Sequence, residues 1–208
     1  MSTPPAFADA AQTWNRRYDC AEFLFGTAPN EWLRAQAHVL PAQGRVLCVA
    51  DGEGRNSVWL ARQGFEVDAF DVANLAVDKA RAFAQREGVS VNFAVADCDG
   101  FAWPEAAYDG VAAIFVQFAD PPLRARLFER IVRSLKPGGV LILQGYTPKQ
   151  LEYRTGGPPI LSHLYTPDLL LAAFAGLSII ELREYEAEIH EGQGHSGRSA
   201  LVGLVARR

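Results

Sequence analysis

Short apolar runs alternate with amphipathic stretches through the first two thirds of the chain. The short runs have the length and composition of buried parallel strands, and they cover residues 46–49, 66–70, 91–95, 110–115 and 140–143. Between them, apolar residues recur every three or four positions, which is typical of helices with one face on a sheet. These helices are expected to begin near Pro29, Val58, Val72 and Pro122. Strands that alternate with helices predict a parallel sheet with helices on both faces.

The end of the chain follows a different pattern. Residues 177–189 and 200–206 are both strand-like, and only Glu191–Gly197 separates them. Such a connection is too short for a crossover helix, so the two strands must pair antiparallel. The predicted fold class is therefore α/β, with a doubly wound seven-stranded sheet that is mostly parallel and ends in an antiparallel hairpin.

The first apolar run leads into a glycine-containing turn. The sequence there is Asp51-Gly52-Glu53-Gly54, and an apolar helical face follows it. Two glycines one residue apart let the backbone approach a ligand closely, and a helix N-terminus points N–H groups at it. The next strand ends at Asp71, 17 residues after Gly54, where an acid accepts hydrogen bonds from ribose hydroxyls. The sequence therefore predicts a nucleoside site, although such turns also occur for backbone reasons alone.

Composition narrows the class of protein. The 208 residues are 49% hydrophobic and 21% charged, which fits one globular domain. A net charge of −4 argues against a nucleic-acid partner, and no apolar run is long enough to cross a membrane. Cys20, Cys48 and Cys98 are scattered, which favours reduced thiols and a cytoplasmic protein. A monomer and a homodimer are both compatible with these features.

The N-terminal region is rich in aromatic residues. Met1–Gln12 is expected to be a loose end, and the segment after it contains Trp14, Arg17 and Tyr18. One interpretation is a pair of helices that cover one face of the sheet. The other is a lid whose three named side chains close over a ligand.

Five parallel strands followed by an antiparallel hairpin resemble the class I S-adenosylmethionine-dependent methyltransferases, which have a Rossmann-like fold. The resemblance runs from Trp14 to about Arg207. The first family motif, acid-x-Gly-x-Gly-x-Gly, stands here as C-V-A-D-G-E-G, with Cys48 in place of the acid and Ala50 in place of a glycine. A tellurite-resistance and thiopurine methyltransferase-like branch is similar in further segments, which read W-x-x-R-Y, F-G-x-x-P-N, G-E-G-R-N and E-G-x-x-H-x-G.

The resemblance implies one methyltransferase domain over residues 1–208. Within it, residues 1–40 would form a helical lid, residues 44–145 the cofactor-binding core, and residues 146–208 an acceptor-side loop and the C-terminal hairpin. The implied cofactor is S-adenosyl-L-methionine, and the implied partner is a small-molecule methyl acceptor.

The resemblance also assigns cofactor contacts. The turn would surround the methionine end, Asp71 would bind the ribose, and Asp97 the adenine amino group. Arg17 is a candidate for the cofactor carboxylate or for an anionic substrate. The whole implied set is Trp14, Arg17, Ala50, Asp51, Gly52, Gly54, Arg55, Asn56, Asp71, Val72, Asp97, Cys98, Val116, Gln117 and Phe118. Two of these have a structural alternative, because Asp97 could cap a turn and Cys98 could be a small core residue.

The acceptor pocket is expected between the N-terminal aromatics and the loop 146–159. Its candidates are Arg17, Tyr18, Phe118, Arg154 and His195. Two arginines favour a small acceptor that is anionic or soft, with a sulfur, selenium, tellurium, oxygen or nitrogen nucleophile. No acid–base pair stands out as catalytic, and an anionic nucleophile needs none.

Three alternatives remain at this stage. An NAD-dependent oxidoreductase would share the glycine turn, but Ser57 stands where its third glycine or alanine belongs. A cofactor-binding regulator without turnover is conceivable because of Cys48 and Ala50. A metal site could be drawn from Glu188, His190, Glu191 and His195, but their spacing matches no tight ligand pattern, and no metal is expected.

Overall fold

The computed structural model describes residues 7–208. Its strands form one sheet in the order β3-β2-β1-β4-β5-β7-β6. Neighbours from β3 to β5 pair in parallel, whereas β7 pairs antiparallel with both β5 and β6. The bounds are β1 Arg45–Val49, β2 Glu66–Asp71, β3 Asn92–Val95, β4 Tyr108–Ile114, β5 Leu135–Tyr146, β6 Ser178–Glu191 and β7 His195–Arg207. The predicted seven-stranded sheet with its C-terminal hairpin is confirmed.

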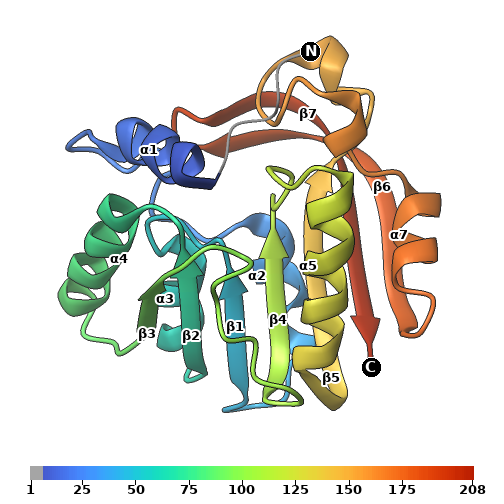
Figure 1. The fold of residues 1–208 in the computed structure, drawn as a ribbon, viewed down its shortest axis with the longest axis horizontal. Coiled ribbons are helices and arrows are strands. Elements are labelled where there is room, and N and C mark those ends of the chain that lie inside the picture. Colours follow the sequence, from blue (N-terminus) through green and yellow to red (C-terminus); the bar gives the residue numbers. More distant parts are fainter. Residues whose placement is uncertain (1–6) are drawn as a thin grey trace.

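Helices cover both faces of the sheet (Figure 1). On one face, α5 and α7 pack over the large core through Leu127, Phe128 and Phe174. On the other face, Trp32 and Leu33 of α2 and Leu60 of α3 pack against the central strands. The helical bounds are α1 Phe7–Tyr18, α2 Glu31–Gln36, η1 Ala37–Val39, α3 Arg55–Arg62, α4 Asn74–Arg86, α5 Pro121–Ser134, α6 Gln150–Tyr153, η2 Leu161–His163 and α7 Pro167–Ala173.

The strand order reverses direction at β1. This strand pairs with β2 on one side and with β4 on the other, so the connections that follow β1 and β4 lead away in opposite directions. A crevice opens at the carboxyl edge of a parallel sheet at such a point, and ligands of open α/β sheets bind there. The glycine turn follows β1 directly and therefore lies at this crevice.

Two boundaries differ from the sequence expectation. The expected loose end at Met1–Gln12 is wrong from Phe7 onward, because α1 begins there; the first six residues lie outside the described part of the chain. The hairpin is also tighter than expected, since β7 begins at His195 and pairs it with Glu191. The sequence analysis left residues 191–197 as a short connection because they are polar and glycine-rich, but antiparallel backbone pairing continues through most of them.

The predicted helix at 29–40 forms as α2 followed by the short 3-10 helix η1. Asn30 caps α2, because its side-chain oxygen accepts the N–H of Leu33 at 3.0 Å. Within residues 7–208, no helix is both long and apolar enough to cross a membrane.

Candidate active site

The turn after β1 is shaped by two glycines with left-handed backbone. Gly52 has φ 62° and Gly54 has φ 88°, a conformation that a side chain makes costly. A Cβ on Gly54 would lie 2.9 Å from Cβ of Ala80 on α4, and a Cβ on Gly52 would lie 2.8 Å from Oη of Tyr18. The turn is therefore held against α4 on one side and the N-terminal helix on the other. Ala50 shares the left-handed conformation, with φ 48°.

Two acidic side chains face this turn. Asp71 is 6% exposed and accepts the N–H of Gly52 at 2.9 Å and that of Ala73 at 2.9 Å. Burial raises the pKa of Asp71, although these N–H groups oppose the rise. Asp51 accepts the hydroxyl of Ser57 through Oδ2, while Oδ1 is buried without a partner among the described residues. Burial raises the pKa of Asp51 to about 7, with the Ser57 hydrogen bond opposing it.

An orphaned carboxylate oxygen beside a side-chain-free bend suits a ligand that carries both a cationic group and a nucleoside. The unpaired oxygen of Asp51 attracts a cation, whereas the Cβ side of Gly52 is covered by the Tyr18 hydroxyl. Asp71 keeps a carboxylate at the end of β2, where ribose hydroxyls are bound in this class of sheet.

The N-terminal helix lies over the turn. Tyr18 is 4% exposed, its ring stacks on Trp14 with centroids 5.7 Å apart, and the guanidinium of Arg17 lies 4.4 Å from the Trp14 centroid. The three predicted lid residues are thus brought together at the cofactor edge. Their closing over a ligand stays a prediction.

Glu53 ties the following segment to the turn, a role that sequence reasoning missed. Its carboxylate accepts the N–H of Leu24 at 2.7 Å and the ammonium of Lys79 at 2.7 Å, and it is 4% exposed. The position of Glu53 between two glycines of a turn was the signal available in the sequence, because an acid that becomes buried there needs a partner.

The adenine side of the predicted site lies after β3. Asp97 accepts the N–H of Gly100, so one oxygen caps a turn, which was the structural alternative for this residue. Cys98 is 2% exposed, and burial raises the pKa of its thiol to about 12. Because that thiol stays neutral, Cys98 is unsuited to be a nucleophile. Next to it, Phe101 stacks on Phe70 with centroids 4.3 Å apart. Adenine binding by Asp97 and Val72 stays a prediction.

The segment after β4 is less open to ligand than expected. Val116 is fully buried in the core. The amide of Gln117 donates to the carbonyls of Tyr146 at 2.9 Å and His163 at 3.0 Å, and its oxygen accepts the N–H of Tyr146 at 2.6 Å. Both side chains are thus engaged within the protein, and Phe118 packs at the edge of the same core. Any cofactor contact from Val116 or Gln117 would have to use the backbone.

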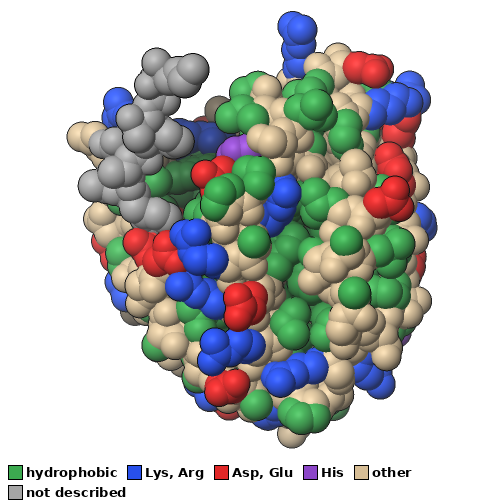
Figure 2. Space-filling model, turned by 45° about the vertical axis from the view of Figure 1, so that its right-hand side comes forward, with side chains coloured by type: hydrophobic (Ala, Val, Ile, Leu, Met, Phe, Trp, Pro, Cys, Tyr) green, Lys and Arg blue, Asp and Glu red, His purple; other side chains and the backbone are tan. Residues whose placement is uncertain are grey.

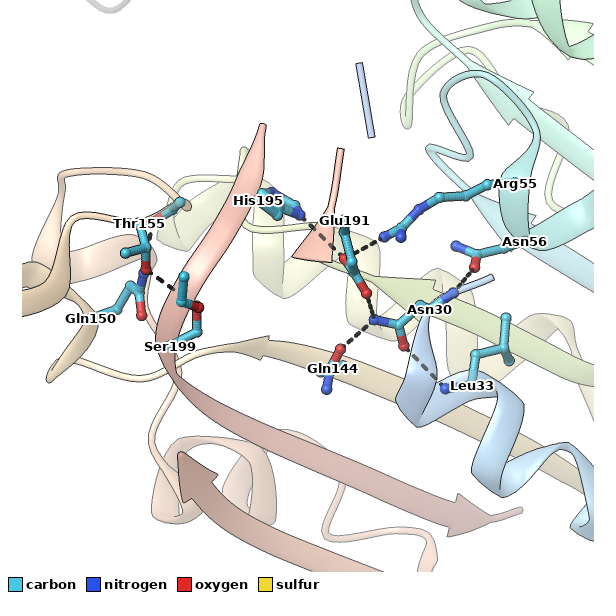
Figure 3. A network of polar contacts seen from close by, with 12 residues as sticks. Asn30, Leu33, Arg55, Asn56, Gln144, Gln150, Thr155, Glu191, His195 and Ser199 are labelled. Atoms are coloured by element: carbon cyan, nitrogen blue, oxygen red, sulfur yellow. Dashed lines mark hydrogen bonds and ion pairs between the residues drawn. The ribbon is translucent and has the colours of Figure 1, made fainter. Parts of the chain in front are cut away.

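A buried polar network lies between α2, α3 and the hairpin (Figure 3). Glu191 accepts from Arg55 Nη2 at 2.8 Å and from Asn30 Nδ2 at 2.9 Å, and both ion-pair side chains are 8% exposed. Asn30 also donates to Gln144 at 2.6 Å, and its N–H donates to Asn56 at 2.9 Å. The side chains of Arg55 and Asn56, predicted to bind the cofactor, are therefore directed at protein partners.

His195 lies at the centre of an aromatic cluster beside this network. Its ring centroid is 4.6 Å from those of Phe25 and Phe115 and 5.6 Å from that of Tyr146. Its Nδ1 approaches Glu191 Oε2 at 3.4 Å. Burial lowers the pKa of His195, and although Glu191 opposes this, Arg55 adds to it. The ring is therefore neutral near pH 7.

The hairpin tip packs directly on the N-terminal segment. The N–H of Gly194 donates to the carbonyl of Leu24 at 3.1 Å. Cβ atoms on Gly192 and Gly194 would collide with the backbone at Leu24 and the ring of Phe25 respectively. The motifs F-G-x-x-P-N and E-G-x-x-H-x-G, far apart in sequence, thus form one contact.

Among the acceptor candidates, the structure brings Arg17, Tyr18 and His195 to one region through Phe25. The Arg17 guanidinium lies 5.9 Å from the Phe25 centroid, and the rings of Tyr18 and His195 contact Phe25 from other sides. Arg154 does not join them by any contact within residues 7–208; it is exposed, at the C-cap of α6.

Comparisons with known proteins agree with this geometry. A family model described as a methyltransferase domain matches residues 46–139. A thiopurine S-methyltransferase of Legionella pneumophila (strain Paris) is 27% identical over 177 residues, covering 75% of each chain. A tRNA 5-carboxymethoxyuridine methyltransferase of Escherichia coli (strain K12) is 30% identical over 118 residues, covering 54% of this chain and 44% of that protein.

Among solved structures, an S-adenosylmethionine-dependent methyltransferase of Methanosarcina mazei superposes with a TM-score of 0.69. It is 19% identical and covers 83% of this chain and 95% of its own, which shows the fold. Together with the matched methyltransferase domain and the relatives, it supports the predicted class I S-adenosylmethionine-dependent methyltransferase. Its cofactor is S-adenosyl-L-methionine, and the dehydrogenase alternative is set aside.

A separate apolar groove lies on the surface formed by two helices. It has a volume of about 530 Å³ and lies between α5 and α7, where Figure 2 shows hydrophobic side chains gathered among arginines. Its lining residues include Phe128, Val132 and Leu169. It shares no residue with the turn or the network around Glu191.

Within residues 7–208, no group of three or more His, Cys, Asp or Glu side chains is placed to hold a metal ion. Glu191 and His195 are instead engaged with Arg55 and with each other. The thiols of Cys20, Cys48 and Cys98 are free, and the last two are buried.

Proposed function

We propose that this methyltransferase transfers a methyl group to a small-molecule acceptor that is anionic or carries a soft nucleophile. The observation that carries the proposal is the position of His195. Its ring is enclosed by Phe25 of the N-terminal segment and Phe115 at the end of β4, on the carboxyl side of the sheet. An aromatic enclosure of this kind suits a compact acceptor rather than a polymer.

The bound cofactor supplies a methyl group on a sulfonium, so the protein's task is to hold the acceptor close, aligned and dry. Asp71 would bind the ribose, and the backbone of the turn at Gly52 and Gly54 would contact the methionine end. Asp51, with one oxygen unpaired, would attract a cationic group of the cofactor. Tyr18 and Trp14 would exclude water from above.

Two groups favour an anionic or soft acceptor. Arg17 makes no ion pair with another described residue, and its guanidinium lies over Trp14 and near Phe25. His195 is neutral because burial lowers its pKa, so it can accept a proton from a neutral nucleophile. A thiol, selenol or phenol acceptor would be served by both groups. Phe118 and Arg154 stay predicted acceptor contacts, although Arg154 is exposed and makes no contact with Arg17, Tyr18 or His195 among the described residues.

A nucleic-acid acceptor is the competing substrate class, since one relative is named for a tRNA modification. The net charge of −4 and the enclosure of His195 favour the small molecule.

The test is a methyl-transfer assay with the purified chain. Release of S-adenosylhomocysteine would be measured with panels of thiols, selenite, tellurite, phenols, amines and bulk tRNA, and the products identified by mass spectrometry. Turnover of a small acceptor that His195→Ala and Arg17→Ala both reduce at least tenfold is the expected result. Turnover of tRNA alone, or small-molecule turnover unchanged in both variants, would refute the proposal.

A cofactor-binding regulator is a second candidate, favoured by the strained Ala50 and by Cys48, which is 2% exposed and packs in the core. Tight binding of S-adenosylmethionine by calorimetry without turnover of any acceptor in the panel would support it.

A further inference from the structure

The carboxylate of Glu53, in the glycine turn, binds two groups from distant parts of the chain. Its Oε2 accepts the backbone N–H of Leu24 at 2.7 Å, and its Oε1 accepts the ammonium of Lys79 at 2.7 Å. The side chain of Glu53 is 3% exposed and that of Lys79 is 21% exposed. Because a buried carboxylate is costly unless it is paired, both partners are held closely to the turn.

Lys79 also binds the segment that follows α1. Its ammonium donates to the carbonyl of Glu22 at 2.8 Å and lies 5.7 Å from the centroid of the Phe23 ring. The neighbouring Ala80 is fully buried, and its Cβ would lie 2.9 Å from a Cβ on Gly54, so α4 packs directly on the turn. One lysine therefore joins α4, the glycine turn and the segment after α1.

We call residues 20–26 the strap. At Leu24 the strap is held from two sides, because its N–H donates to Glu53 while its carbonyl accepts the N–H of Gly194 at 3.1 Å. The bond to the hairpin is made by backbone groups alone. The bonds to the turn depend on the side chains of Glu53 and Lys79. Substitution of these two side chains can therefore release the strap from the turn and leave its bond to the hairpin in place.

The strap begins two residues after Tyr18, whose hydroxyl lies over the turn. A Cβ on Gly52 would be 2.8 Å from that hydroxyl. On the other side of Tyr18, Asn15 binds the start of α4, where its amide donates to Asn74 at 2.8 Å and its oxygen accepts the N–H of Leu75 at 3.1 Å. Figure 1 shows α1 beside α4 at this edge of the molecule. Tyr18 is thus held over the turn between Asn15 and the strap.

The charges around the turn give the ion pair a second possible effect. The carboxyl groups of Asp51, Glu53 and Asp71 all lie at the turn, and burial raises the pKa of Asp51 to about 7. Arg55 offsets part of the negative charge of Asp51, and Lys79 pairs with Glu53. Removal of the lysine charge makes these surroundings more negative, whereas removal of the Glu53 charge makes them less negative. An effect of charge alone therefore has opposite signs for the two substitutions.

We propose that Glu53 and Lys79 are positioning residues for S-adenosylmethionine, whose ion pair holds the strap and Tyr18 closed over the glycine turn and so slows release of the cofactor. Neither side chain is assigned a contact with the cofactor. The inference goes beyond the proposed function, because it concerns retention of the cofactor whatever the acceptor is. It rests on the predicted placement of the cofactor at this turn.

The experiment measures how fast S-adenosylmethionine and S-adenosylhomocysteine leave the immobilised full chain, by surface plasmon resonance. Lys79→Met and Glu53→Gln should each speed the release of both ligands about tenfold, because either change frees the strap from the turn. The double variant should release them no faster than the faster single variant, since both substitutions undo the same attachment. Unchanged release in both single variants would overturn the proposal.

The two ligands separate positioning from charge. S-adenosylmethionine carries one positive charge more than S-adenosylhomocysteine, on its sulfonium. If the ion pair acted only through its field, Lys79→Met would slow the release of S-adenosylmethionine and Glu53→Gln would speed it, with little change for S-adenosylhomocysteine. That pattern would overturn the positioning role, which requires faster release of both ligands in both variants.

Lys136→Met is the matched control. Asp109 accepts the ammonium of Lys136 at 2.8 Å and the backbone N–H of Arg45 at 2.8 Å, so it repeats the combination of partners found at Glu53. This second pair lies where β4 and β5 begin, at the opposite edge of the sheet from the turn. Lys136→Met should leave both release rates unchanged. An equal acceleration in Lys136→Met and Lys79→Met would trace the effect to a general loss of stability and overturn the proposal.

Hydrogen exchange at the Leu24 amide reports on the strap itself. With S-adenosylhomocysteine bound, this amide should exchange faster in Lys79→Met and Glu53→Gln than in the parent and in Lys136→Met. Faster exchange with unchanged release rates would show that the strap is structural only and would overturn the proposal. A parent chain that binds neither ligand would refute it together with the placement of the cofactor.

Discussion

Arg55 and Glu191 form an ion pair of 2.8 Å in which both side chains are 8% exposed, across 136 residues of sequence. The pair connects the first residue of α3 to the last residue of β6, so it fixes the hairpin against the helix that follows the glycine turn. Burial alone would raise the pKa of Glu191, but the hydrogen bonds from His195 and Arg55 outweigh it and hold that pKa at about 2. The carboxylate is therefore ionised throughout the physiological range.

Removing the charge of Glu191 should cost stability. Glu191→Gln leaves the Arg55 guanidinium buried without its counter-charge, and breaking a buried pair from one side costs about 3–5 kcal/mol. We expect urea unfolding to show a loss of about 3 kcal/mol. Glu31→Gln is the control, since its pair with Arg34 is exposed and should contribute less than about 1 kcal/mol. Equal small losses in both variants would show that the buried pair contributes no more than a surface pair.

The contact between Gly194 and Phe25 should tolerate no added methyl group. Gly194→Ala forces the ring or the hairpin to move, which typically costs about 1–3 kcal/mol. Gly176→Ala is the matched control, because nothing lies within 4 Å of its Cβ position. Thermal unfolding should therefore separate the two alanine variants. If both unfold at the parent temperature, the packing of the hairpin tip on the N-terminal segment is looser than described.

Asp51 should make stability depend on pH. Its folded pKa of about 7 lies above the unfolded value near 4, so the folded state binds the extra proton between these limits. Stability contributed by the protonated form is present at low pH and is lost as pH rises toward 7. The side chain in Asp51→Asn cannot ionise. The free energy of unfolding of this variant, relative to that of the parent, should therefore be about 2 kcal/mol higher at pH 8 than at pH 5. Parallel pH profiles from chemical unfolding would contradict the raised pKa.

Ala50 offers a test of the departure from the family motif. Left-handed backbone costs a non-glycine residue about 1–2 kcal/mol, whereas glycine adds an entropic cost of about 0.5–1 kcal/mol. Ala50→Gly should therefore raise the free energy of unfolding by roughly 0.5–1 kcal/mol. Ala112 lies in the buried strand β4 and has no such strain. Ala112→Gly should therefore lower the free energy of unfolding. A loss of stability in both variants would mean that the strain at residue 50 is already compensated.

The sequence predicted what depends on local pattern. The apolar runs place β1 and β2, and the paired glycines place the left-handed turn after β1, because strand burial and left-handed turns leave signatures within a few residues. The hairpin followed from the brevity of its connection. Its early closure at His195 could not be read, since the polar residues there are compatible with both loop and strand.

The hydrogen-bond network around Glu191 could not be predicted from local sequence patterns. Asn30 meets Gln144 and Glu191 across 114 and 161 residues, and no spacing rule connects such positions. One signal was available: Gln144 directly follows the apolar run of β5, and a polar side chain in a buried strand needs a partner. Arg55 was assigned to the cofactor because of its place in the turn motif. The direction of its side chain is set by a residue near the other end of the chain.

The bond from Asn30 to Glu191 also bears on how the molecule is made. A ribosome releases the first thirty residues long before residue 191 exists, so the segment with Leu24 and Phe25 must wait without its hairpin partner. Contacts of such long range form slowly because the chain must close a large loop first. The aromatic cluster around His195 would then be among the last parts of this domain to assemble, after the hairpin residues have been made.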